Sequence, residues 1–142
     1  FGAGMSSRLF QEIREKRGLA YSTFAFSGAY SDAGYFGMYA GCLPAKTEQV
    51  REVMGHEFDK LAAAGITEEE LLKVRGQLAG STVLGSEDSG SRMSRLGRAE
   101  MDSGQFTSTD ELLEKIRAVS LDEVRDLAAF LGEQQMITTI VR

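Results

Sequence analysis

Arg14 and Tyr21 are the residues whose types and spacing best fit a chemical task. They lie on either side of Gly18 in the stretch MSSRLFQEIREKRGLAYS. Arginine offers a fork of donors for carbonyl or carboxylate oxygens, and a tyrosine hydroxyl can donate to an oxyanion. A helix rises about 6 Å from Arg14 to Gly18, and a strand advances about 10 Å from Gly18 to Tyr21. If the chain reverses at Gly18, both side chains can reach one point.

A purely structural interpretation of the pair competes with this one. Arg14 would be a solvated helix residue, and Tyr21 an amphipathic strand residue. No carboxylate lies three or four residues from Arg14, where a helix would place an ion-pair partner. Glu12 and Glu15 are closer in sequence but are expected to point elsewhere. The residues alone therefore leave both interpretations open.

The other reactive residue types do not form a catalytic set. His56 is the single histidine, and its context, VMGHEFDK, lacks the second histidine of an inverted H-x-x-E-H zinc motif. Zinc hydrolases use about three protein ligands, and Ser/His or Cys/His catalysis would also depend on His56 alone. We expect His56 to be a partly exposed helix residue and Cys42 a small buried apolar one. The chain by itself is expected to be inactive.

The elements that position these residues begin with a helix and two strands. Met5, Leu9 and Ile13 recur four apart and predict one apolar helix face, with Ser6 or Ser7 as the cap and Gly18 as the stop. The segments 19–26 and 35–42 are short, aromatic and apolar, which predicts two antiparallel strands joined by a loop.

Helices dominate the remaining chain. An apolar stripe over residues 50–61 predicts one helix, which ends before Gly65. Three capping-box signatures predict further helix starts, and these are Thr67 with Glu70, Ser108 with Glu111, and Ser120 with Glu123. Residues 93–101 predict a weaker helix, and residues 136–141 (MITTIV) predict a closing strand.

This order favours an α+β fold, an antiparallel sheet with helices packed on one face, over a doubly wound parallel sheet. The 142 residues fit a single domain spanning 1–142. Three strands are few for so many helices, and the chain opens on the loop-like FGAG. We therefore expect it to be part of a longer protein that carries its first strands upstream.

Composition excludes several function classes. The formal net charge is −5, which argues against a nucleic-acid partner because phosphate binding needs a basic surface. No apolar run approaches the roughly 20 residues that cross a bilayer, so no membrane role is expected. The single cysteine and the lack of a signal-like segment favour a cytoplasmic location.

The stretch GAGMSSRLFQEIREKRGLAYS closely resembles the C-terminal domain of M16 zinc peptidases, the family of mitochondrial processing peptidase, pitrilysin and insulin-degrading enzyme. The likeness is greatest to the bacterial processing-peptidase-like branch, and it continues more loosely to the end of the chain. The resemblance implies two similar α+β halves around a chamber. The N-terminal half would carry zinc on H-x-x-E-H, and the C-terminal half an arginine and a tyrosine.

Those two residues match Arg14 in EIREK and Tyr21 in GLAYS, and Arg17 is a poorer match. The resemblance assigns both to the substrate near the scissile bond, with the tyrosine stabilising the oxyanion. No H-x-x-E-H occurs in the chain, so no metal ligand and no cofactor is expected in it, and zinc is expected in the N-terminal half. The implied partners are a peptide substrate and a zinc-bearing half, from the same chain or another subunit, in a homo- or heterodimer.

The residues and the resemblance together leave three hypotheses for the function of the chain. The first is the C-terminal part of an M16-type zinc metalloendopeptidase, which contributes substrate and oxyanion contacts for extended peptides. The second is a non-catalytic M16-like subunit that binds peptides or acts as a scaffold. The third is an unrelated α+β interaction domain.

Overall fold

The computed structural model describes residues 1–30 and 32–141. The chain divides into two compact units, one made of Phe1–Gly65 with Arg125–Arg142 and the other of Ile66–Val124. Each unit has its own packing and is described by itself. The single domain expected from length stays a prediction.

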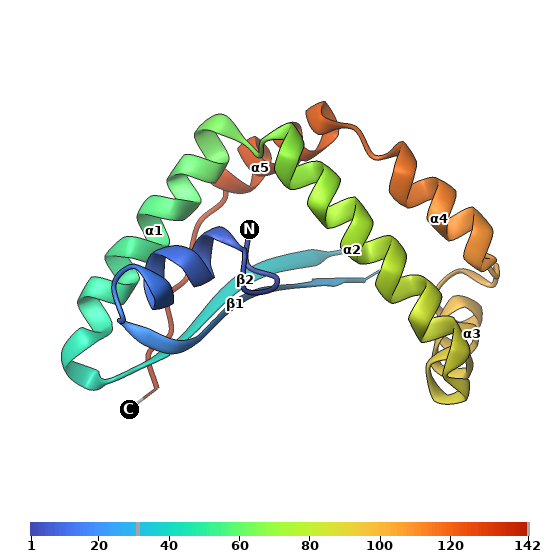
Figure 1. The fold of residues 1–142 in the computed structure, drawn as a ribbon, viewed down its shortest axis with the longest axis horizontal. Coiled ribbons are helices and arrows are strands. Elements are labelled where there is room, and N and C mark those ends of the chain that lie inside the picture. Colours follow the sequence, from blue (N-terminus) through green and yellow to red (C-terminus); the bar gives the residue numbers. More distant parts are fainter. Residues whose placement is uncertain (31, 142) are drawn as a thin grey trace. The chain divides into compact units, whose positions relative to one another are not determined.

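The first unit holds the predicted helix and hairpin (Figure 1). Its elements before the division are η1 (Phe10–Glu15), β1 (Ala20–Ala29), β2 (Gly34–Cys42), the short turn η2 (Pro44–Lys46) and α1 (Thr47–Ala64). β1 and β2 pair antiparallel, which confirms the α+β class and the antiparallel sheet. Both strands extend past their predicted ends toward the connecting loop.

One face of the hairpin packs against η1 and α1. Leu9 and Ile13 of the first helical segment are fully buried, and they meet Leu19 and Ala20 of the hairpin side and Val50 of α1. The ring of Phe36 on β2 stacks on Phe58 of α1, with centroids 6.0 Å apart. The helices of this unit thus cover one sheet face, as predicted.

The second unit is helical. It contains α2 (Glu68–Glu87), α3 (Ser89–Ser103) and α4 (Thr109–Ala118), and α5 (Leu121–Gly132) continues from it into the first unit. Thr67 and Ser108 form the predicted capping boxes of α2 and α4. Ser120 exchanges the same pair of hydrogen bonds with Glu123 at the start of α5.

Two predicted features are wrong. Residues 136–141 form no strand, because they pair with neither strand of the sheet, and an apolar pattern becomes a strand only where a ladder partner exists. Met5 does not belong to the apolar helix face, since it precedes the helix and is 75% exposed. Within the described residues, no helix combines the length and apolar character that a membrane crossing requires.

Candidate functional site

The helix that carries Arg14 is a π-helix. The N–H of Lys16 donates to the carbonyl of Gln11, five residues back, at 2.9 Å. Ser7 caps the preceding turn, because its Oγ accepts a hydrogen bond from the N–H of Phe10 at 3.4 Å. π-Helical turns are rare and often mark functional sites. The wider turn sets where Arg14 leaves the helix surface.

Gly18 reverses the chain, as expected. Its φ of +57° lies in the left-handed region, where a glycine meets no steric penalty. Its N–H donates to the carbonyl of Arg14 at 3.0 Å, and the N–H of Leu19 donates to the carbonyl of Ile13 at 2.9 Å. These two bonds fasten the start of the strand to the last turn of the helix.

Tyr21 lies on a β-bulge. Ala20 pairs with Cys42 and Ser22 pairs with Gly41, so Tyr21 is the extra residue between two consecutive partners. The bulge breaks the alternation of the strand, and Tyr21 and Ser22 both face solvent in succession. Bulges of this kind redirect a side chain. Tyr21 as a whole residue is 80% exposed.

Arg14 and Tyr21 lie in direct contact. The guanidinium carbon of Arg14 is 4.4 Å from the centroid of the Tyr21 ring, and Nη1 donates to the Tyr21 carbonyl at 3.3 Å. The ring of Phe10 lies 4.8 Å from the same guanidinium carbon. Arg14 also has a carboxylate neighbour that sequence reasoning excluded, since its Nε is 3.6 Å from Oε1 of Glu15. Helical spacing rules consider positions three and four away and overlook the adjacent one.

A second charged cluster lies on the same segment. Lys16 and Arg17 both pair with the carboxylate of Glu12, and Arg17 Nη1 also donates to the Glu12 carbonyl at 2.8 Å. The hydrogen bond from Lys16, followed by that from Arg17, lowers the pKa of Glu12 from 4.5 to about 2. Arg17 is therefore occupied by Glu12, whereas Arg14 faces the aromatic rings.

Residues 1–78 match the family described as the peptidase M16 inactive domain. The matched range is more than half of the chain and includes both Arg14 and Tyr21. The chain belongs to the peptidase M16 family. An unrelated interaction domain is thereby excluded.

Two bacterial relatives illustrate the M16 assignment. The chain is 46% identical over 140 residues to an uncharacterized zinc protease of Streptomyces coelicolor, covering 98% of this chain and 30% of that protein. It is 38% identical over 140 residues to an uncharacterized zinc protease of Bacillus subtilis, covering 99% of this chain and 34% of that one. The chain thus spans about a third of the length of these M16 relatives.

Solved structures share the M16 fold at low sequence identity. A peptidase M16 inactive domain from Pseudomonas fluorescens has a TM-score of 0.78 at 22% identity, over 91% of this chain and 31% of that one. A conserved protein from Enterococcus faecalis has a TM-score of 0.74 at 24% identity, over 89% and 29%. At these identities the likeness concerns the fold.

The described residues of this M16 chain do not fit zinc. His56 is exposed on α1, and nowhere in residues 1–30 and 32–141 do three or more His, Cys, Asp or Glu side chains gather as a metal site. Cys42 is half-buried rather than fully buried, with its Sγ 4.0 Å from Oγ1 of Thr47. Arg14 and Tyr21 carry a cationic fork of donors and a hydroxyl donor, which are groups able to bind an oxygen and stabilise negative charge on it.

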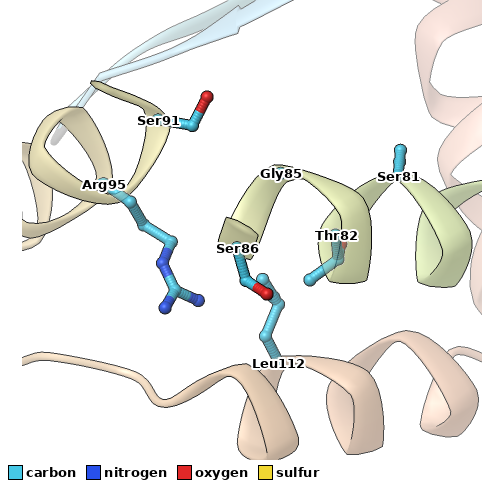
Figure 2. Close-up of a pocket in the computed structure, with 7 residues that line it drawn as sticks. All are labelled: Ser81, Thr82, Gly85, Ser86, Ser91, Arg95 and Leu112. Carbon is cyan, nitrogen blue, oxygen red and sulfur yellow. The ribbon is translucent and has the colours of Figure 1, made fainter. Parts of the chain in front are cut away.

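A depression in the second unit does not add to the site. It has a volume of about 160 Å³ and is lined by Ser81, Thr82, Gly85, Ser86, Ser91, Arg95 and Leu112 (Figure 2). Its one cation, Arg95, donates to Oγ1 of Thr109 at 3.1 Å and lies 5.2 Å from the Phe106 ring centroid. These lining residues lie outside residues 1–78, the range that matches the peptidase M16 inactive domain.

Sequence reasoning selected Arg14 and Tyr21 but missed the structure that holds them in contact. Three features were not predicted from the sequence, namely the π-turn, the bulge at Tyr21 and the contact of Arg14 with Phe10. No signal for the bulge is present in the sequence, and the bulge shows only in the burial pattern, where Ala20 and Thr23 lie three apart rather than two. Both of these residues are buried.

Proposed function

We propose that this chain is the substrate-holding part of an M16-type zinc metalloendopeptidase acting on extended peptides. Arg14 and Tyr21 contact the substrate next to the scissile bond, and the Tyr21 hydroxyl donates to the oxyanion that forms there. Zinc is bound by a half of the protein that lies outside these residues.

The contact between Arg14 and Tyr21 carries this proposal. The guanidinium over the ring and its bond to the Tyr21 carbonyl support a fixed orientation of the two side chains. The exposed phenol leaves its hydroxyl open to an incoming ligand. A cation beside a donor hydroxyl suits a carbonyl oxygen that gains negative charge, because preorganised donors stabilise such charge most.

The test uses the full-length protein and a quenched fluorogenic peptide without secondary structure. Arg14→Lys keeps the charge and removes the fork of donors, and Tyr21→Phe keeps the ring and removes the hydroxyl. Each is expected to lower kcat/KM by about 10- to 100-fold, since loss of one oxyanion donor costs a factor of about 100 or more in favourable cases. Bound zinc, measured by elemental analysis, is expected to be unchanged.

Two neighbouring variants serve as controls. Arg17→Lys changes an arginine three residues from Arg14 that is occupied by Glu12. Ser22→Ala removes the hydroxyl next to Tyr21 on the same bulge. Both should keep the kcat/KM of the unmodified protein. Full activity in Arg14→Lys and Tyr21→Phe would refute the roles proposed for these two residues.

A non-catalytic M16-like subunit, which binds peptides or acts as a scaffold, is the alternative. The description of the matched family as an inactive domain and the missing zinc ligands fit this alternative and the peptidase equally, because the peptidase would bind zinc outside these residues. The residues preceding Phe1 in the full-length protein discriminate the two. An H-x-x-E-H motif with a distal glutamate supports the peptidase, and its absence supports the subunit.

We also propose self-association, most simply as a symmetric dimer, in the cytoplasm. In the described residues each strand pairs only with the other, which leaves two backbone edges that a second chain can use. Sedimentation of residues 1–142 on their own across a concentration series tests this, because strands from the rest of a longer protein would cover these edges. A strictly monomeric profile contradicts it.

A further inference from the structure

The hairpin face opposite η1 and α1 carries a continuous row of aromatic rings. Phe24 stacks on Tyr39 with centroids 4.9 Å apart, and Phe26 lies 6.1 Å from both Phe24 and Tyr35. We call these four residues the aromatic ladder. Each of them is between 42% and 51% exposed. Tyr30, 6.3 Å from Tyr35, continues the row at the loop end.

Glycines opposite the rings show that this surface is built into the hairpin. Gly28 pairs with Tyr35 and Gly37 pairs with Phe26 across the sheet. A Cβ on Gly28 would be 2.4 Å from the Tyr35 ring, and one on Gly37 would be 2.5 Å from the Phe26 ring. The rings of Tyr35 and Phe26 therefore each lie over a glycine of the opposite strand, where a larger residue would displace them.

The lack of charge on the aromatic ladder determines which side chains can bind to it. β1 and β2 contain no Asp, Glu, Lys, Arg or His. An uncharged aromatic surface gains free energy from apolar side chains, and charged ones would lose hydration on it without finding a partner. Tyrosine, which supplies half of the ladder, combines an apolar ring with a polar tip and suits a surface that is alternately wet and covered.

The ladder leads to the Arg14–Tyr21 contact. Tyr39 leans over Gly41, where an added Cβ would be 3.3 Å from the Tyr39 hydroxyl. Gly41 pairs with Ser22, the residue that follows Tyr21 on the bulge. From Tyr21 to Gly28, which pairs with Tyr35, the strand advances about 23 Å, the length of about seven extended peptide residues.

We propose that the aromatic ladder binds the apolar and aromatic side chains of an extended peptide whose scissile bond lies at Arg14 and Tyr21. This inference rests on the proposed function and defines the substrate class, namely peptides with an apolar segment on one side of the cleaved bond. Continuity with the Arg14–Tyr21 contact and the absence of charge favour this occupant over a second copy of the chain.

The test compares two fluorogenic peptides on the full-length protein. The two peptides share one cleavable core. In one peptide the residues flanking the core are Leu and Phe, and in the other they are Ser and Glu. The comparison is made first with the flank before the cleaved bond and then with the flank after it. The Tyr35→Thr and Phe24→Thr variants remove a ring and keep a residue suited to strands. Each is expected to raise KM for the apolar peptide about 3- to 10-fold, as the loss of one aromatic contact predicts. KM for the polar peptide and kcat for both are expected to stay unchanged.

Leu43→Ser is the matched control, because Leu43 is 72% exposed in the same unit but outside the ladder. Phe24→Leu keeps an apolar side chain on the strand and replaces Phe24→Thr if that variant unfolds. If KM changes equally for both peptides, or for neither, the proposed role of the aromatic ladder in binding is refuted. A shift in oligomeric state without a KM change points to a second copy and also overturns it. Unchanged kcat/KM for both peptides in Arg14→Lys and Tyr21→Phe defeats the proposed function itself, and the two failures are thereby distinguished.

Discussion

The guanidinium of Arg14 lies over the ring of Tyr21 and at the same time donates to the carbonyl of that residue. One side chain therefore fixes both the ring and the backbone of the bulge. The two residues come from different elements, a π-helix and a strand, and seven positions separate them in sequence. Their contact joins the helix and the strand at this junction into one candidate site.

A double-mutant cycle measures this contact directly. Arg14→Gln and Tyr21→Leu are each expected to lower the free energy of unfolding of the full-length protein by less than about 1 kcal/mol, because the contact is partly exposed. The coupling between them is expected to be about 0.5–1 kcal/mol. Urea denaturation of the four proteins gives both quantities. Additive single effects would show that the two side chains do not interact in solution.

The fully buried Ile13 anchors the segment that presents Arg14. Ile13→Ala is expected to cost about 2–5 kcal/mol, since the deleted atoms leave a cavity between η1, the hairpin and α1. Met5→Ala is the control at an exposed position and should stay within about 0.5 kcal/mol. Thermal unfolding of the full-length protein compares them. Equal midpoints would contradict the core described around Ile13.

The Glu12 cluster predicts a dependence of stability on acid. The lowered pKa of Glu12, about 2, means that the folded protein keeps this carboxylate charged where the unfolded chain, with a pKa near 4.5, takes up a proton. The stabilisation is fully present above about pH 4.5 and is lost as the pH falls toward 2. For solvent-screened pairs it amounts to about 1 kcal/mol.

Glu12→Gln removes the titrating group, so its stability should change less than that of the unmodified protein between pH 5 and pH 2. Lys16→Met removes the larger contribution to the shift and should have part of the same effect. Urea midpoints at several pH values provide the comparison. Parallel curves for Glu12→Gln and the unmodified protein would contradict the prediction.

Gly37 is expected to disfavour a side chain. A Cβ there meets the tip of the Phe26 ring at 2.5 Å, so Gly37→Ala must displace this half-exposed ring from its aromatic neighbours and should cost about 0.5–1.5 kcal/mol. Gly55→Ala is the matched control, because its added Cβ would meet nothing within 4 Å in α1, and it should stabilise by up to about 1 kcal/mol. A lower thermal midpoint for Gly37→Ala together with a higher one for Gly55→Ala would confirm both predictions. Shifts of the same sign would argue against the packing of Phe26.

Local signals in the sequence predicted much of the fold. The capping boxes at Thr67, Ser108 and Ser120 each place a helix start, because the side chains and backbone that make them lie within four residues. Gly18 predicted the reversal for the same reason. The segment 136–141 failed as a strand, since a strand depends on a partner that its own residues do not specify.

The candidate site was predictable in its residue types but not in its geometry. The resemblance selected Arg14 and Tyr21, and the reversal at Gly18 made their approach feasible. The π-turn depends on hydrogen bonds between residues five apart, such as the bond from Lys16 to Gln11. No pattern of side chains in the sequence predicts such bonds. The ladder needed cross-strand register, because Phe24 and Tyr39 become neighbours only once the strands are aligned.

The wide turn of η1 fixes the angle at which Arg14 projects. An α-helix rotates by about 100° for each residue, so removing Gln11 or Glu12 would turn Leu9 by about that angle relative to Ile13 and Arg14, which both follow the gap. Ile13 and Arg14 would keep their relation to the strand, whereas Leu9 would leave the core that it shares with Ile13. The length of this segment therefore decides whether the residues before the gap can still pack beneath the helix that presents Arg14.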